Sequence, residues 1–422
     1  MPPKLDKSFA LWEEALQLIP AGTQTFSKAP SQFAFGSAPV FLERGEGAYV
    51  FDVDGNRYVD YSMSLGAVIL GYGYPSTVET IQHQVTQGTI LSLMHPLEVK
   101  LAKLLVDVVP CAEMVRFGKN GSDVTAGAVR AARAYTGREI VATCGYHGWQ
   151  DWYISSTARS IGTPVAIRDL TLSFDYNNLH SLDRIFREHP GQLAAVIMEP
   201  TGVTPPMEGF LEGVQRLCRE NGALLIFDEV ITGFRMALGG AQEFFGIIPD
   251  MTCLGKAMGN GMPISAVVGR REIMKIFEEV FFSFTFGGEM ASLAAAADTI
   301  RILSEEPVLD QIWQLGRELR DGYNELARRH GLTGVTACTG YPPRTALSFK
   351  NQDGEESLEL TTLFHQEVIS NGVLLCGGHN LSYAHSAGDI ESTLAVYDAA
   401  LTVLRKAVDS GEVRSYLRGP VN

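Results

Sequence analysis

The sequence contains little that suits a membrane, nucleic-acid-binding or secreted protein. It has 34 lysines and arginines against 48 aspartates and glutamates, a formal net charge of −14, and no basic tail. Such a balance argues against non-specific binding to nucleic-acid phosphates or to anionic membranes. No apolar run approaches the ~18 residues that a membrane span needs, and the first residues lack the apolar core of a secretory signal. We therefore expect a cytoplasmic protein with neither nucleic-acid nor membrane partners.

Cysteine is scarce as well, and the six cysteines are scattered along the chain. There is no C-x-x-C or H-E-x-x-H motif, and the nine histidines do not cluster at metal-ligand spacing, so we expect reduced thiols and no metal site. Internal repeats and low-complexity segments are also lacking, which excludes a solenoid. What the sequence does have is length, because 422 residues, 45% of them hydrophobic, are enough for two or more domains.

Short apolar runs recur through the middle of the chain, and helical patterns separate them. The runs at residues 139–144, 193–198 and 223–227 are too short for free-standing helices and are typical of strands buried on both faces. Strands that alternate with helices predict a parallel sheet covered by helices on both faces. The fold class that we expect is therefore α/β.

The two ends of the chain follow a different pattern. Residues 9–19 have helical spacing, and Asp54-Gly55 lies between two apolar runs, which is typical of a tight β-hairpin. From about residue 306 onward, helical runs again alternate with short strand-like runs. We expect a helix and hairpin in residues 1–65 that join a small domain, a large domain in residues 66–305, and a small C-terminal domain in residues 306–422.

Two buried runs in the middle of the chain end in ionisable residues. Asp228 and Glu229 follow the run at 223–227, and Lys256 follows a run at 251–254. Ligands bind at the carboxyl ends of the strands in open α/β sheets, so we expect Asp228 and Lys256 to lie at one edge. A lysine in a semi-apolar pocket can condense with a carbonyl group, and a buried aspartate can pair with the protonated ring nitrogen of pyridoxal phosphate (PLP). The alternative is a structural ion pair, or a lysine on the surface.

A second set of polar residues follows a strand-like run at 114–117. Asn120, Gly121 and Ser122 form a small-residue turn ahead of a predicted helix, with Ser122 as the expected N-cap. The backbone N–H groups, the serine hydroxyl and the helix dipole can together bind a phosphate, although the same residues also suit an ordinary capped helix. Farther along, Tyr146 follows another predicted strand and can stack on a flat cofactor ring or pack at its rim.

The joint order of these motifs resembles one family. Together they are similar to class III (omega) aminotransferases of fold-type I, within which the chain most resembles the glutamate-1-semialdehyde aminomutase branch. The resemblance runs from about residue 11 to about residue 404 and implies a mainly parallel central sheet with helices on both faces, plus a smaller α+β domain. The motifs that carry it are Asn120-Gly121-Ser122, Tyr146-His147-Gly148, Glu199-Pro200, residues 227–235 and 254–261, and Phe284-Thr285-Phe286-Gly287-Gly288.

The resemblance implies roles for individual residues. Lys256 matches the lysine that forms the internal Schiff base with PLP and shuttles a proton, and Asp228 matches the partner of the pyridine nitrogen. Tyr146 matches the catalytic-site residue stacked above the ring, and Val230 the apolar residue beneath it. The other implied cofactor-binding residues are Asn120, Gly121 and Ser122 in the phosphate loop, His147 beside Tyr146, Glu199 near the substrate side, and Thr285, which reaches the phosphate in the neighbouring subunit.

The implied activity is that of a PLP-dependent aminotransferase, active as a homodimer with shared sites. It moves an amino group between a small amine, amino acid or amino sugar and a keto acid or aldehyde by a ping-pong mechanism. One alternative is an intramolecular 2,1-aminomutase of the glutamate-1-semialdehyde type. Another is a catalytically silent PLP-fold binding protein, which would be expected to lack Lys256, Asp228 or the phosphate loop.

Lys28 bears on the choice between the first two activities. It lies where the aminomutase branch is expected to have an arginine that holds the substrate carboxylate, and a lysine cannot make the bidentate fork. This counts against the aminomutase, although a solvated loop lysine is the simpler interpretation. Residues 376–382 and 384–386 are expected to be loops, either near the pocket or on the ordinary surface.

Overall fold

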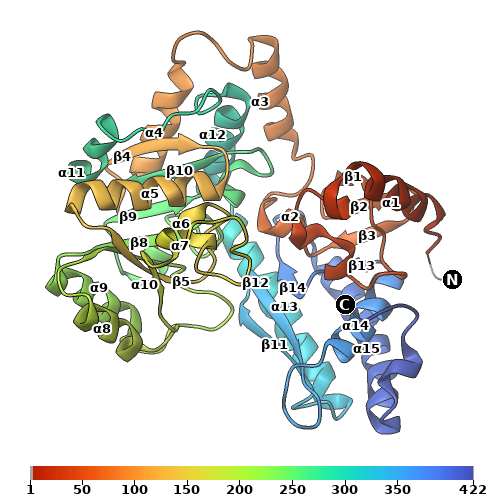
Figure 1. Cartoon of the computed structure of the whole chain (residues 1–422). Helices are drawn as coiled ribbons and strands as arrows, with labels where there is room; N and C mark the ends of the chain where they lie inside the picture. The colour runs from red at the N-terminus through yellow and green to blue at the C-terminus, as the bar shows by residue number, and fades with distance from the viewer. Residues whose placement is uncertain (1–2, 422) are drawn as a thin grey trace. The chain divides into compact units, whose positions relative to one another are not determined.

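The computed structural model describes residues 3–421, which divide into two compact units. One unit, here the terminal unit, joins the residues up to Tyr74 to those from Asp310 onward. The other, the central unit, runs from Pro75 to Leu309. The colours of Figure 1 follow this organisation along the chain, with red and blue segments in the terminal unit and orange to green segments in the central unit.

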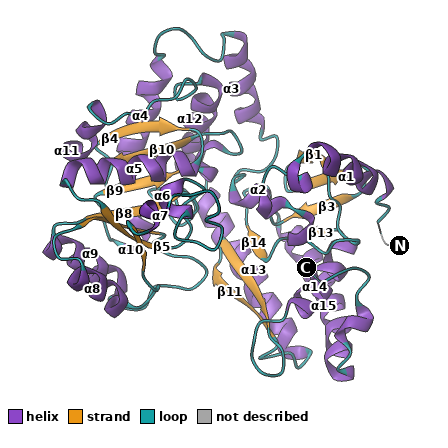
Figure 2. Cartoon of the chain, in the orientation of Figure 1, coloured by secondary structure: helices purple, strands orange, loops and turns teal. Residues whose placement is uncertain are grey.

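A seven-stranded sheet forms the middle of the central unit, with strand order β4-β10-β9-β8-β7-β5-β6 (Figure 2). β10 is antiparallel to both of its neighbours, whereas the pairs from β9 to β6 are all parallel. The predicted mainly parallel α/β sheet is confirmed. The strands are β4 (Met114–Gly118), β5 (Ile140–Cys144), β6 (Thr171–Ser173), β7 (Leu193–Met198), β8 (Leu224–Glu229), β9 (Met251–Leu254) and β10 (Ser265–Gly269).

Helices cover both faces of this sheet, and the alternation of side chains along β8 shows why. Ile226 packs into a core cluster with Val124 and Ala128 of α5, whereas Leu225 and Phe227 pack into a second cluster with residues of α8 and α9. A strand buried on both faces must be apolar at nearly every position, as the runs in the sequence are. The helices are α3 (Pro75–Thr86), α4 (Pro96–Val108), α5 (Gly121–Thr136), α6 (Asp151–Ile154), α7 (Val165–Arg168), α8 (Leu179–Glu188), α9 (Phe210–Asn221), α10 (Ala241–Phe245), η4 (Lys256–Gly259), α11 (Arg271–Met274), η5 (Lys275–Glu278) and α12 (Met290–Glu305).

The terminal unit contains two small sheets, with orders β1-β2-β3-β13 and β11-β12-β14. The predicted hairpin is confirmed, because β2 and β3 pair antiparallel on either side of Gly55, whose φ of 91° suits glycine. Its elements are α1 (Asp6–Leu18), η1 (Pro20–Gly22), η2 (Phe26–Lys28), η3 (Pro30–Gln32), β1 (Leu42–Glu46), β2 (Tyr49–Asp52), β3 (Arg57–Asp60), α2 (Met63–Gly66), α13 (Val308–Arg329, which begins at the boundary), β11 (Thr336–Tyr341), β12 (Arg344–Phe349), α14 (Leu358–Ser370), β13 (Val373–Leu374), β14 (Gly378–Asn380), α15 (Ala387–Ser410) and η6 (Val413–Tyr416).

The expectation that residues 376–382 form a loop is wrong in part, because β14 occupies Gly378–Asn380. This strand pairs antiparallel with the edge of β12, and the backbones come so close that a Cβ added at Gly378 would lie 2.1 Å from the carbonyl oxygen of Thr345. A three-residue strand set by such a contact leaves no periodic pattern in the sequence. Ser386 caps α15 by accepting a hydrogen bond from the backbone N–H of Asp389 at 3.2 Å.

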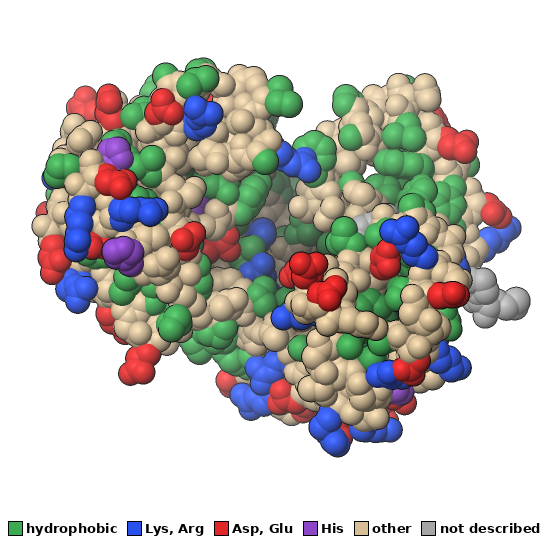
Figure 3. Space-filling model, turned by 60° about the horizontal axis from the view of Figure 1, so that its bottom comes forward, with side chains coloured by type: hydrophobic (Ala, Val, Ile, Leu, Met, Phe, Trp, Pro, Cys, Tyr) green, Lys and Arg blue, Asp and Glu red, His purple; other side chains and the backbone are tan. Residues whose placement is uncertain are grey.

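The surface and the helices bear on the expected partners. On the face seen in Figure 3, acidic and basic side chains are interspersed, and that face has no uniformly basic stretch. None of the helices between residues 3 and 421 combines the length and hydropathy of a bilayer-spanning segment.

Candidate functional site

Asp228 lies near the carboxyl end of β8, where it is only 5% exposed and directly paired with His147. The distance from His147 Nδ1 to Asp228 Oδ2 is 2.8 Å, and Asp228 Oδ1 accepts a hydrogen bond from the backbone N–H of Val230 at 3.2 Å. The His147 ring stacks on Trp152, with ring centres 6.1 Å apart. Both oxygens of Asp228 are thus held in fixed directions by groups from two different loops.

Lys256 follows β9, the strand next to β8, and only Gly255 separates it from the end of β9. Asp228 is paired in register with Cys253, and Glu229 with Leu254, so the sheet places Asp228 and Lys256 at the same edge. Lys256 has a φ of 42°, in the left-handed region that favours glycine. Such a conformation costs ~1–3 kcal/mol, and residues that adopt it are enriched at functional sites. The predicted juxtaposition of these two strand ends therefore agrees with the sheet register.

Glu229 is adjacent to Asp228 but serves a different purpose. It is fully buried and accepts hydrogen bonds from the Thr232 hydroxyl at 2.9 Å, from the backbone and side chain of Gln242 at 3.1 and 3.0 Å, and from the backbone of Ala241. Burial raises the pKa of Glu229, although the bonds from Ala241 and Gln242 oppose the rise. Glu229 therefore ties the segment after β8, and the start of α10, to the sheet.

The turn before α5 is capped differently from the prediction. Asn120, not Ser122, is the N-cap residue, and Asp123 Oδ2 accepts hydrogen bonds from the backbone N–H of Asn120 at 2.7 Å and of Lys119 at 3.1 Å. Asparagine suits the N-cap as well as serine does, and an acid three residues later completes the cap. Ser122 instead lies inside the first turn, where its hydroxyl accepts a hydrogen bond from the backbone N–H of Trp149 at 3.2 Å.

Close packing brings this turn to the other predicted residues. A Cβ added at Gly121 would lie 3.0 Å from Val230 Cγ1, and one added at Gly148 would lie 2.2 Å from Ser122 Oγ. Gly148 also has a φ of 102°, so only glycine fits there without strain. The first turn of α5, the segment after β8 and the loop after β5 therefore meet at one edge of the sheet.

Tyr146 and Glu199 are brought together at the neighbouring strand ends. The backbone N–H of Tyr146 donates to Glu199 Oε1 at 2.9 Å, and the backbone N–H of Glu199 donates to the carbonyl of Cys144 at 3.1 Å. The Tyr146 side chain is 65% exposed and meets Tyr153 edge-on, with ring centres 5.8 Å apart. Its ring face is therefore accessible at the rim of this edge.

Two predicted residues, Thr285 and Lys28, are not among those that meet at this edge of the sheet. Thr285 is exposed on the loop between Phe282 and α12, outside the hydrogen bonds that join the other predicted residues. Lys28 belongs to the terminal unit, where its side chain is exposed and Nζ donates to Ser64 Oγ at 3.2 Å. Lys28 also lines a cavity of about 270 Å³ beside the buried Asp60.

Sequence reasoning missed several residues that shape these places. Ser265, the first residue of β10, donates through its hydroxyl to the carbonyl of Asn120 at 2.8 Å and so holds the turn before α5. Met63, Ser64 and Leu65 have consecutive left-handed φ angles of 43°, 51° and 60°, and no residue preference in the sequence signals this. The Asp228–His147 pair joins residues 81 apart in sequence, so it depends on the folded sheet.

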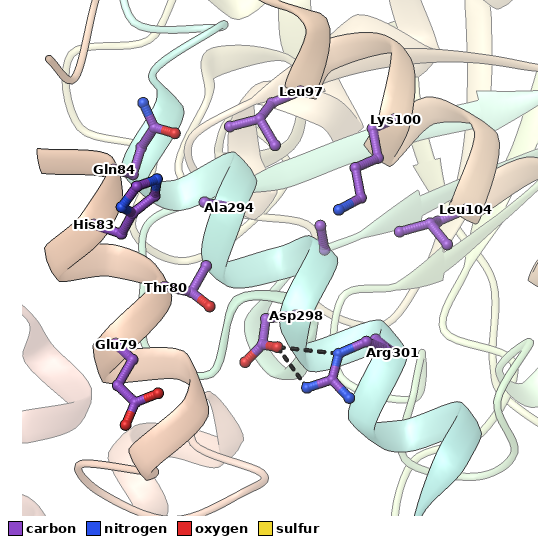
Figure 4. Close-up of a pocket in the computed structure, with 11 residues that line it drawn as sticks. Glu79, Thr80, His83, Gln84, Leu97, Lys100, Leu104, Ala294, Asp298 and Arg301 are labelled. Carbon is purple, nitrogen blue, oxygen red and sulfur yellow. Dashed lines mark hydrogen bonds and ion pairs between the residues drawn. The ribbon is translucent and has the colours of Figure 1, made fainter. Parts of the chain in front are cut away.

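A separate cavity of about 550 Å³ lies between α3, α4 and α12, and none of the predicted site residues lines it (Figure 4). On its α12 side, Asp298 accepts hydrogen bonds from the hydroxyls of Ser76 and Thr77 and pairs with Arg301 at 2.8 Å. These contacts hold the start of α3 to α12, which accounts for Asp298 and Arg301 structurally.

Comparison with known proteins gives one consistent result. Residues 33–380 match the family described as Aminotransferase class-III. A glutamate-1-semialdehyde 2,1-aminomutase of Syntrophobacter fumaroxidans is 36% identical over 417 residues, with 92% of this chain and 96% of that protein covered. A 3-aminobutyryl-CoA aminotransferase of Cloacimonas acidaminovorans is 35% identical, with 96% of this chain and 98% of that protein covered. Among solved structures, the FumI protein of a Sphingopyxis species, in its PLP internal aldimine form, has a TM-score of 0.90 at 30% identity over 96% of this chain and 98% of its own.

Proposed function

The chain belongs to the class III aminotransferase family, because the family match spans residues 33–380 and relatives of 35–36% identity cover nearly all of it, and we propose how its own residues serve amino-group transfer. It is a PLP-dependent enzyme of fold-type I that takes a small-molecule amino donor and a carbonyl acceptor. The observation that carries the residue assignment is the edge of the sheet where β8 presents Asp228 and β9 presents Lys256.

The residues at this edge fit PLP in charge and shape. When bound, PLP supplies a protonated ring that withdraws electrons from the substrate carbon. Asp228, held by His147 at 2.8 Å, is the carboxylate for the ring nitrogen, and the first N–H groups of α5 at Gly121 and Ser122 bind the phosphate. Glycine at 121 and 148 leaves room there that a Cβ would fill.

The remaining assigned residues act on the ring and on the substrate. Lys256 would hold the cofactor through its amine. Once the incoming amino donor has displaced that amine, its free Nζ would carry the proton from the substrate carbon to the cofactor carbon bonded to the transferred nitrogen. Tyr146, which is exposed at the rim, covers one face of the ring. Val230, which lies against Gly121, covers the other face. Asn120 belongs to the phosphate turn, which Ser265 holds through the Asn120 carbonyl, and His147 holds Asp228. Glu199 borders the substrate side next to Tyr146.

A spectral titration tests this assignment. The protein is loaded with PLP, and amino donors are screened for loss of the visible cofactor band and for product formation. Lys256→Ala is expected to bind PLP without a covalent link and to lose turnover. Lys275→Ala, at an exposed lysine of η5, is expected to keep the covalent link and the turnover. Turnover that survives in Lys256→Ala would refute the assignment.

The aminomutase remains the second candidate, because several relatives at 36–37% identity carry that name. An intermolecular transaminase needs an external amino donor, whereas a mutase rearranges its substrate alone. Lys28 supports the intermolecular reaction, since an ammonium group cannot form the two-pronged contact with a substrate carboxylate that an arginine makes. Turnover of glutamate 1-semialdehyde without any added donor would favour the mutase. A protein that binds PLP but processes no amine would instead be the silent binding protein.

We further propose a homodimer in which Thr285 reaches the phosphate of the partner's cofactor. Leu93 and Met94, each 85% exposed, follow α3, while Phe281 and Phe286, 81% and 57% exposed, flank Thr285. A hydrogen bond links the two loops, from the backbone N–H of Met290 at the start of α12 to the carbonyl of Thr89 at 2.8 Å. Large apolar side chains exposed together are typical of an interface, and a second copy would cover them.

Light scattering after size-exclusion chromatography checks the dimer. The double substitution of Leu93 and Met94 by aspartate is expected to shift the protein toward monomers and to weaken PLP binding. Leu358→Asp, at an exposed leucine of the terminal unit, serves as control and is expected to leave the mass unchanged.

We place this enzyme in the cytoplasm because all six cysteines are free thiols, five of them buried.

A further inference from the structure

An ion pair joins the N-terminal ends of two long helices in the central unit. Lys119 Nζ lies 3.0 Å from Glu289 Oε2, and each side chain is only 17% exposed. Lys119 precedes Asn120, the N-cap of α5, and Glu289 is itself the N-cap of α12. The pair therefore connects the turn assigned to the cofactor phosphate with the loop that carries Thr285.

The Glu289 carboxylate is fixed by several donors besides Lys119. Its Oε1 accepts a hydrogen bond from the backbone N–H of Ala291 at 2.8 Å, and Oε2 accepts from the backbone N–H and the hydroxyl of Ser292 at 3.1 and 2.5 Å. Burial raises the pKa of Glu289, but the bonds from Ser292 and Lys119 outweigh it and lower the pKa below its usual value. Glu289 therefore stays ionised at neutral pH and offers Lys119 a rigid anionic partner.

Lys119 is fixed at its backbone as well. Its N–H donates to the same Asp123 oxygen that accepts the N–H of Asn120. On the loop side, a Cβ added at Gly288 would lie 2.8 Å from Glu98 Oε1, so the residue before Glu289 rests against the start of α4. The backbones next to Lys119 and Glu289 are therefore fixed as well, at the turn before α5 and at the loop before α12.

We propose that Lys119 and Glu289 are positioning residues whose ion pair holds the turn from Asn120 to Ser122 in the geometry that binds the cofactor phosphate. This inference rests on the proposed function. A preformed set of N–H donors binds an anion more tightly than one that must be ordered on binding, so the pair contributes to phosphate affinity without touching the cofactor. Lys119 Nζ pairs with Glu289, and the direct phosphate contacts in this assignment are the N–H groups of α5.

The dissociation constants of PLP and of pyridoxal, which lacks the phosphate, test this assignment. Lys119→Met and Glu289→Gln are each expected to raise the PLP constant about tenfold, because each leaves a partly buried charge without its partner. Neither substitution should change the pyridoxal constant, since that ligand has no anion for the turn. The double variant is expected to bind PLP no more weakly than the single variants, as coupled residues do in a double-mutant cycle.

Two further variants separate positioning from simple stability. Lys119→Arg keeps the charge and reach and should bind PLP like the unaltered protein, as should Lys103→Met, at an exposed lysine of α4. Melting temperatures of the cofactor-free proteins are measured in parallel. A lower melting temperature with an unchanged PLP constant, or an equal loss of PLP and pyridoxal binding, would overturn the inference. An unaltered protein that bound no PLP would overturn the proposed function as well.

Discussion

Asp228 and Glu229 are neighbours with opposite duties, because successive side chains of a strand point to opposite faces. Asp228 meets His147 at the edge that we assign to the cofactor, whereas Glu229 accepts four hydrogen bonds from Thr232, Ala241 and Gln242. One carboxylate is thus available to a ligand, and the other is consumed by the fold. An acidic pair at a strand end therefore does not imply two catalytic acids.

Matched amide substitutions at these two positions should have different effects. Asp228→Asn keeps the shape but removes the charge that stabilises a protonated ring, so we expect kcat to fall roughly 100- to 1,000-fold with little change in melting temperature. Glu229→Gln leaves backbone donors poorly satisfied, so we expect a loss of ~1–3 kcal/mol in unfolding free energy. Steady-state kinetics and denaturant unfolding measure the two effects. Equal loss of activity and stability in both variants would contradict the division of roles.

Asp228 and Lys256 could be placed from the sequence because strand ends of a parallel sheet meet at one edge, whichever residues surround them. The cap of α5 could not, since Asn120 and Ser122 have similar cap preferences and the contact of Asp123 decides between them. The partner of Asp228 also escaped, because His147 reaches it only through the pairing of separate strands. Roles that depend on one tertiary contact leave no local pattern.

At the scale of elements, the turn before α5 depends on close approach by the loop after β5. Gly148 combines a φ of 102° with a position where a Cβ would lie 2.2 Å from Ser122 Oγ. Gly162 has a similar φ of 90° but nothing within 4 Å of such a Cβ. The two glycines therefore separate backbone strain from collision with the turn.

We expect Gly148→Ala to weaken PLP binding and to cost ~1–3 kcal/mol of stability, because Ser122 must move to admit the methyl group. Gly162→Ala carries the left-handed strain alone and should leave the PLP dissociation constant unchanged. Absorbance titration with PLP and thermal melting of each variant check both expectations. An equal effect on PLP binding in the two variants would show that the collision is unimportant.

Strands with unbroken apolar runs, such as β5, β7 and β8, could be predicted because burial on both faces demands such runs. The three-residue β14 could not, since pairing with β12 creates it. The same holds for α2, where three consecutive left-handed residues oppose every local preference. Strands buried on both faces can therefore be predicted from their apolar runs, whereas β14 and α2 depend on tertiary contacts.

For the whole molecule, substrate identity depends on loops that the fold leaves free to vary, so the sequence and the architecture predict amino transfer but not its donor. Stability against acid, by contrast, can be predicted from buried histidines. Burial lowers the pKa of His365 to about 4, and burial together with nearby histidines lowers that of His379 to about 3. Both lie in the terminal unit.

We expect the melting temperature to fall as pH decreases below ~6.5, the value of an exposed histidine, toward 4. The unfolded chain takes up protons in that range while the folded chain does not, so the stability present above ~6.5 is progressively lost. His365→Gln should reduce the slope of this decline, whereas substitution of the exposed His83 should not. Calorimetry between pH 4 and 8 measures the slopes, and identical slopes in both variants would contradict this origin.

The terminal unit is built from both ends of the chain, with β13 at residues 373–374 lying parallel beside β3 at 57–60. A nascent chain leaving the ribosome therefore exposes the free edge of β3 long before β13 exists. At ~5–20 residues per second the wait is roughly 15–60 s, during which the central unit is fully synthesised. The sheet that begins with β1, β2 and β3 therefore gains its fourth strand only after the whole central unit has been synthesised.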